Sequence, residues 1–121
     1  MSNERVYKMK FSEIYPLYLQ KAERKNRTQA ELDEIVYWLT GYSNEGFANV
    51  LASEIDLEGF FAKAPLINPN ADKVKGVICG VRVEEVADPL MRKIRILDKL
   101  VDELAKGKSM DKILGKYIDS V

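Results

Sequence analysis

Hydrophobic residues recur at helical spacing along most of the chain, most regularly between residues 88 and 106. The apolar side chains there follow one another at intervals of four, three, four and three residues, as Leu90, Ile94, Leu97, Val101 and Leu104. This spacing places them on one face of a helix, which Asp88 and Pro89 are suited to begin and Gly107 to end. We expect this face to belong to the core, with a helix-pairing dimer surface as the alternative.

Residues with capping side chains divide the first half of the chain into further helices. Ser12 favours the start of a helix that continues to about Asn26. Thr28 and Glu31 have the spacing of a capping box, and Gly41 is suited to end the helix that they begin. The cations that crowd the far end of the first helix, where the helix dipole favours them, are Lys21, Arg24, Lys25 and Arg27. Residues 1–10 are expected to be extended or loosely ordered.

Shorter elements complete the prediction. Ser43 and Asp56 are placed to cap two short helices, and Ser109 to cap a last one that Ile118 could extend. Residues 65–76 have the composition of a loop. Residues 77–83, VICGVRV, are rich in β-branched side chains but contain a glycine and have no second strong strand to pair with. We expect irregular or helical backbone there, or at most a minor short strand.

The predicted fold is mainly α, a compact orthogonal bundle of five or six helices that forms a single helical domain over residues 1–121. Of the 121 residues, 46% are hydrophobic and 31% are charged, which is typical of one globular domain. Apolar stretches are too short to span a membrane, and the charged first ten residues are not expected to act as a secretory signal. One cysteine cannot form an intrachain disulfide, so a cytoplasmic protein is the simplest interpretation.

The absence of histidine restricts the chemistry open to the chain. With no His and one Cys, there is no Ser-His-Asp or Cys-His pair, and no zinc site made from His or several Cys ligands. Reactions that use carboxylates, Lys, Tyr or a lone Cys remain open. We therefore expect no cofactor and no metal, and we lean against enzymatic activity.

The formal charge is zero, from 19 basic and 19 acidic residues, but the charges are unevenly distributed. Segments 1–27, 28–63, 64–82, 83–88 and 89–121 carry net charges of +4, −6, +2, −3 and +3. An acidic middle packed among basic ends explains this pattern, and an acidic face that meets a partner is the alternative. The helices around Gly41 outline a helix-turn-helix, yet residues 28–62 contain no Lys or Arg, which argues against DNA recognition by this motif.

One group of candidate site residues lies near the end of the VICGVRV segment. Arg82 could lower the pKa of the Cys79 thiol, although a small buried cysteine is the better-supported interpretation. Glu84 forms an acidic cluster with Glu85 and Asp88 that could hold a cation. Neighbouring side chains point in different directions, and Asp88 is already expected to cap a helix, so a metal site is not predicted.

Amide and aromatic side chains supply the other candidates. Asn68 and Asn70 lie in the predicted loop and could join residues 79–84 in a ligand cleft. Trp38 and Tyr42 lie on either side of the predicted helix end. Aromatic side chains of this kind favour a binding surface where they remain exposed, and belong to the core where they do not.

Several short stretches together resemble those of a known family. They are Tyr15-Pro16-Leu17-Tyr18, Lys21-Ala22-Glu23-Arg24-Lys25, Trp38-Leu39-Thr40-Gly41-Tyr42, Phe60-Phe61 with Ala64-Pro65, Asn68-Pro69-Asn70, Gly76-Val77, Cys79-Gly80-Val81-Arg82-Val83-Glu84, Asp88-Pro89-Leu90-Met91 and residues 97–107. Over nearly its whole length the sequence resembles the small, uncharacterised bacterial proteins known as domain of unknown function 2200. The resemblance implies membership of this family, and it brings no activity or catalytic residues with it.

Three kinds of function remain open. The first, which we expect, is a non-enzymatic cytoplasmic helical domain that acts through protein or small-ligand contacts, for example as a homodimer. The second is a small enzyme or ligand-binding protein that uses residues 68–85. The third, a nucleic-acid binder, needs one continuous basic face built from Lys21–Arg27 and Arg92–Lys116. Neither nucleic acid nor a membrane is an expected partner.

Overall fold

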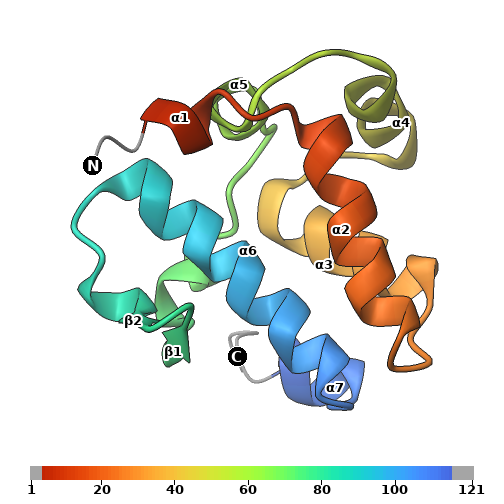
Figure 1. The fold of residues 1–121 in the computed structure, drawn as a ribbon, viewed down its shortest axis with the longest axis vertical. Coiled ribbons are helices and arrows are strands. Elements are labelled where there is room, and N and C mark those ends of the chain that lie inside the picture. The colour runs from red at the N-terminus through yellow and green to blue at the C-terminus, as the bar shows by residue number, and fades with distance from the viewer. Residues whose placement is uncertain (1–3, 116–121) are drawn as a thin grey trace.

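The computed structural model describes residues 4–115 and is mainly α-helical (Figure 1). Its helices in this range are α1 (Glu4–Tyr7), α2 (Phe11–Glu23), α3 (Gln29–Thr40), α4 (Asn44–Ala52), α5 (Leu57–Ala62), α6 (Pro89–Ala105) and α7 (Met110–Ile113). Between α5 and α6 lie the 3-10 helix η1 (Pro69–Lys73), strands β1 (Val77–Ile78) and β2 (Val81–Arg82), and the 3-10 helix η2 (Val83–Glu85). The prediction of a mainly α fold with a minor short strand is confirmed.

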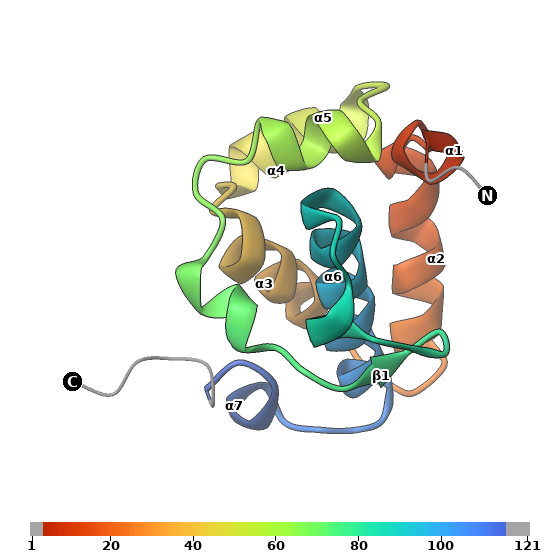
Figure 2. The same ribbon diagram turned by 90° about the vertical axis from the view of Figure 1, so that its left-hand side faces the viewer.

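Helix α6 lies at the centre of the bundle, where its apolar face is covered by other elements (Figure 2). Ile94, Leu97, Val101 and Leu104 are each at most 4% exposed, and Leu90 is half-buried against the same core. Helices α2 and α3 pack on α6, as do α5, α7, β1 and η2. The predicted apolar face is therefore core, and it is not available as a dimer surface.

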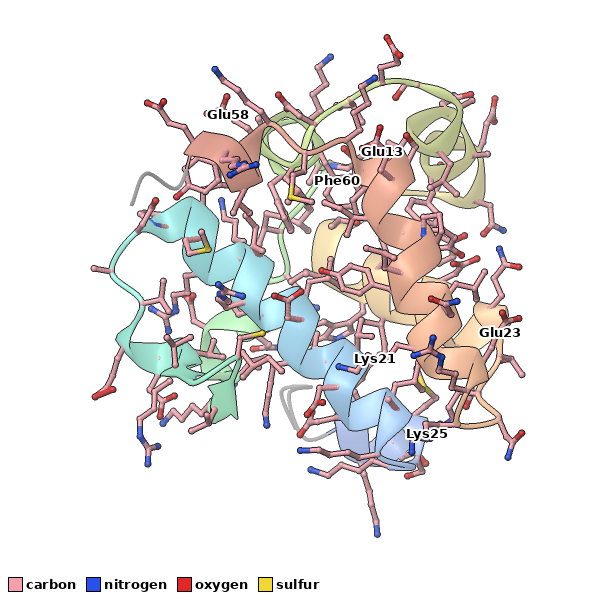
Figure 3. The ribbon with its side chains drawn as sticks, in the orientation of Figure 1. Glu13, Lys21, Glu23, Lys25, Glu58 and Phe60 are labelled. Atoms are coloured by element: carbon pink, nitrogen blue, oxygen red, sulfur yellow. The ribbon has the colours of Figure 1, made fainter. Side chains whose placement is uncertain are left out.

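Side-chain hydrogen bonds align the first two helices with α6. Tyr7, Tyr18 and Lys21 donate to the carboxylates of Asp88, Asp98 and Asp102, respectively. Donor and acceptor are separated along the chain by 81, 80 and 81 residues. Because the separation is nearly constant, the α1–α2 segment and α6 run in the same direction, as Figure 1 shows. Figure 3 shows Lys21 pointing from α2 toward α6, where its Nζ lies 3.3 Å from Asp102 Oδ1.

Arg27 joins the start of α3 to the end of α6. Its Nε and Nη2 donate to the two carboxylate oxygens of Glu31, at 3.2 and 2.7 Å. Its Nη1 donates to the carbonyls of Leu104 and Lys108, at 3.1 and 2.6 Å. A cation is favoured at the C-terminal end of a helix, where carbonyls lack partners within the helix. The end that Arg27 stabilises is that of α6, because α2 already ends at Glu23.

Helix capping is predicted correctly at five starts. Thr28 and Glu31 form the capping box of α3, and Asp88 with Pro89 begins α6. The side chains that accept from a backbone N–H at the other three starts are those of Ser43, Asp56 and Ser109. Gly41 ends α3 in the left-handed conformation, with φ of 74°, as predicted.

The prediction that Ser12 caps the first helix is wrong. Helix α2 begins at Phe11 and has no side-chain cap, because the Phe11 N–H donates to the distant carbonyl of Ile55 at 2.9 Å. The Leu57 N–H donates to the Met9 carbonyl in return, also at 2.9 Å. A contact between two segments thus replaces the local cap.

Two further differences concern the ends of elements. Residues 4–7 form α1, where extended or loosely ordered chain was expected, and Tyr7 joins this helix to Asp88. The first long helix ends before the predicted Asn26, which adopts a left-handed φ of 62°. Ile118 lies outside the described residues. Among residues 4–115, no helix is both long and apolar enough to cross a membrane.

Replacing Arg27 should destabilise the fold more than replacing a cation on the same loop. We expect Arg27→Gln to lower the free energy of unfolding by about 2 kcal/mol, because several charge-assisted hydrogen bonds are lost. The exposed Arg24 is the matched control, and Arg24→Gln should cost less than about 0.5 kcal/mol. Urea unfolding followed by circular dichroism measures both values, and equal losses would contradict the assigned role of Arg27.

The contribution of Glu31 to stability should depend on pH. Arg27, followed by the Thr28 N–H, lowers the pKa of Glu31 from 4.5 to about 2. A carboxyl group with a depressed pKa stabilises the folded state above its unfolded pKa and loses this effect as the pH falls. Wild type should therefore exceed Glu31→Gln in stability at neutral pH, and the difference should shrink from about pH 4.5 to about pH 2. Urea midpoints across this range test it; a constant difference would contradict the assignment.

Candidate functional site

The VICGVRV segment folds back on itself as a β-hairpin. Val77 lies opposite Arg82, and Ile78 lies opposite Val81, in an antiparallel pair. Cys79 and Gly80 form the turn with φ of 53° and 78°. Positive φ at both positions is typical of a two-residue hairpin turn. The segment thus supplies both strands itself, which explains why no separate partner strand is found in the sequence.

The hairpin is held against α6 by its inner side. Ile78 is buried, and Lys99 Nζ on α6 donates to the Val77 carbonyl at 3.3 Å. The Lys99 stem crosses Gly76, where an added Cβ would lie 2.9 Å from Cε and where φ is +120°. Glycine at this position lets the two segments approach closely.

The hairpin exposes one aliphatic side chain from each of its two strands. Val77 is 51% exposed and Val81 is 40% exposed. We define the hairpin face as the residues that line one open hollow of about 560 Å³: Val77, Gly80, Val81, Arg82, Glu85 and Val86. The hairpin lies at the edge of the molecule in Figure 1, away from the axis of α6. Its surface combines an apolar centre with one basic and one acidic side chain.

Cys79 is exposed, and the expectation of a buried cysteine is wrong. Its place in a tight turn at the tip of the hairpin accounts for the difference, since only Ile78 beside it points into the core. The pKa of Tyr18, which joins α2 to α6, is raised well above its usual value, chiefly by burial and then by Asp98.

Arg82 lies beside Glu84, at an N–O distance of 3.7 Å. Glu84 Oε1 also accepts the Gly76 N–H at 3.1 Å. This backbone hydrogen bond is the main reason that the pKa of Glu84 is lowered, and Arg82 adds to the effect. Glu84 is thus an ionised carboxylate that joins the two ends of the hairpin.

The amide and aromatic candidates pack the end of α3. Asn68 Oδ1 accepts the Asn70 N–H at 2.8 Å at the start of η1, and the Asn68 N–H donates to the Leu39 carbonyl at 2.9 Å. Tyr42 is buried, and its hydroxyl donates to the Phe60 carbonyl at 2.7 Å. Trp38 is half-buried against the core. These contacts give the four residues structural roles.

The acidic cluster of residues 84–88 is divided among separate contacts. Asp88 accepts from the Leu90 N–H at the start of α6 and from the Tyr7 hydroxyl, whereas Glu84 binds the hairpin. Glu85 lines the hairpin face. Within residues 4–115, no three acidic or Cys side chains are grouped closely enough to hold a metal ion.

One polar cluster gives no signal in the sequence. Asp98 on α6 accepts from Tyr18 at 2.5 Å and from Arg95 Nη1 at 3.3 Å. These three side chains line a hollow of about 210 Å³ together with Met9 and Leu17, which are exposed. Tyr18 and Asp98 are 80 residues apart, so spacing along the chain could not have paired them.

Comparison with known proteins shows the family. A family model described as an uncharacterised protein conserved in bacteria, domain of unknown function 2200, matches residues 5–115. The chain belongs to this family. A crystal structure of uncharacterised protein SP1917 is similar at 41% sequence identity and a TM-score of 0.92, and the match covers 100% of this chain and 98% of that one. No curated protein matches the chain. The resemblance in the sequence is confirmed, and it extends to the fold.

The Cys79 thiol should react rapidly in the folded protein. Because Cys79 is exposed at the hairpin tip, its labelling by a chromogenic disulfide should be nearly as fast as in the urea-unfolded chain. The unfolded chain is the control, since it contains the same single thiol. A native rate more than about a hundredfold slower would mean that labelling requires local unfolding, and it would contradict the exposed turn.

Proposed function

We propose that the chain is a non-enzymatic binding domain that pairs with a second copy of itself through the hairpin face. The observation that carries this proposal is the exposure of Val77 and Val81 beside the open hollow. Valine is usually buried in soluble proteins, and an apolar surface bordered by polar residues is typical of a protein contact site. The proposed setting is the cytoplasm, where an exposed thiol such as that of Cys79 stays reduced.

The charges of the hairpin face favour a second copy as the partner. Arg82 and Glu85 line the same hollow and carry opposite charges. In a two-fold symmetric dimer the same surface meets itself, so Arg82 of each copy can lie opposite Glu85 of the other. The valines would then pack near the two-fold axis, with the ion pairs around them.

An enzyme built from residues 68–85 has weaker support. A general base must accept a proton near the working pH, whereas the lowered pKa of Glu84 keeps its carboxylate ionised. Glu84 also holds the Gly76 N–H, and Asn68 begins η1. These polar side chains stabilise the hairpin and the loop before it, so their hydrogen bonds support a structural role and not a catalytic one.

The charge pairing can be tested by reversing each charge. We expect wild type to dimerise, and Arg82→Glu and Glu85→Arg to weaken the dimer by about tenfold each, because like charges then face one another. The double variant R82E/E85R restores opposite charges and should recover most of the affinity. Sedimentation velocity over a concentration series measures each dissociation constant.

Two aliphatic variants complete this experiment. Val81→Asp should abolish the dimer, because it places a charge at the apolar centre of the hairpin face. Leu66→Asp is the matched control, since Leu66 is 67% exposed but lies outside this face. Circular dichroism verifies that each variant is folded. A monomeric wild type, or equal weakening by both aspartates, would overturn the proposal.

A further inference from the structure

A second cavity lies between η1 and the first turns of α6, two elements that face one another in Figure 2. Its volume is about 170 Å³. Ile67, Ala71 and Ile96 supply apolar wall, and Asp72, Arg92 and Lys93 supply the charged groups. The cavity therefore has an apolar interior with two cations and one carboxylate at its border.

Arg92 carries a hydrogen-bond donor that the protein itself does not use. Its Nε is buried and has no hydrogen-bond partner, whereas its Nη2 reaches the main-chain carbonyl of Asp72 at 3.4 Å. Buried donors in folded proteins are nearly always paired, because an unpaired one loses its hydration without compensation. The guanidinium that lines this cavity therefore keeps hydrogen-bonding capacity that the Asp72 carbonyl alone does not use.

The positive charge of this cavity comes from side chains and not from the end of the helix. Asp88 already accepts the Leu90 N–H at 3.2 Å, and Pro89 has no N–H to offer. Arg92 and Lys93 together outweigh the single carboxylate of Asp72. An anion is therefore favoured, and a planar carboxylate suits the forked donors of an arginine.

We propose that this cavity binds a small organic carboxylate with an apolar body. The carboxylate accepts hydrogen bonds from Arg92, and Lys93 adds its charge. The body fills the space beside Ile67, Ala71 and Ile96. A dry apolar cavity of about 150 Å³ holds a benzene ring, so this one suits a ligand of roughly six to nine non-hydrogen atoms. An inorganic anion would leave the apolar wall without contacts. This site is separate from the hairpin face, so it does not depend on the proposed dimer.

Benzoate is a suitable probe, because it combines the charge with a ring of the right size. We expect sodium benzoate, titrated into the full ¹⁵N-labelled chain at constant ionic strength, to shift the amide signals of residues 71–72 and 92–93 saturably. Benzyl alcohol keeps the ring without the charge, and acetate keeps the charge without the ring. Each should bind at least about tenfold more weakly than benzoate, since each lacks one half of the interaction.

Substitution of the cation tests the assigned donor. Arg92→Gln should weaken benzoate binding by about tenfold or more through the loss of a charge-assisted pair, and Lys93→Gln should weaken it less. Arg24→Gln, an equal loss of charge at an exposed position just after α2, should leave the affinity unchanged. The dispersion of the amide spectrum shows that each variant is folded. Absence of saturable shifts at millimolar benzoate, equal binding of acetate, or an unaffected Arg92→Gln variant would overturn the proposal.

Discussion

The burial of α6 from several directions constrains where most of the other elements can lie. Its apolar residues are covered by α2 and α3, by α5 and α7, and by the segment from β1 to η2. A fully buried aliphatic side chain contributes about 1.5–3 kcal/mol relative to an exposed one, so this helix provides a large share of the hydrophobic stabilisation. The tyrosine–aspartate pairs and Arg27 then fix the direction and the ends of the helices, because hydrogen bonds are directional and hydrophobic burial is not.

Features that depend on neighbouring residues could be predicted from the sequence, and those that depend on distant ones could not. The capping box of Thr28, the left-handed Gly41 and the apolar face of α6 each arise within a few turns of one helix. Ser12 failed as a cap because the carbonyl of Ile55 satisfies the backbone there. Arg27 is a second example. The sequence predicts a cation at the end of a helix, but the helix whose end it stabilises is α6, which begins 62 residues later at Pro89.

The candidate sites show the same division at the level of function. Arg82 and Glu84 lie close together because they are only two residues apart, at the end of β2 and in η2. The exposure of Val77 and Val81 could not be predicted, since a run of β-branched residues is equally typical of a buried strand. In the sequence, Arg92 cannot be distinguished from the other cations of an amphipathic helix. Only the fold, which places η1 beside it, shows that it lines a cavity. The sequence thus identifies residues that can belong to a site, whereas the fold decides which side chains surround them and how exposed they are.

The parallel alignment of α1–α2 with α6 has a consequence for synthesis of the chain on the ribosome. The partners of Tyr18 and Lys21 are 80 and 81 residues further along, so they are translated long after α2 has left the exit tunnel. Until then the apolar surface of α2 and α3 that packs on α6 stays exposed. Such a topology postpones this part of the collapse until α6 has been translated, and apolar surface that stays exposed in the interval favours aggregation.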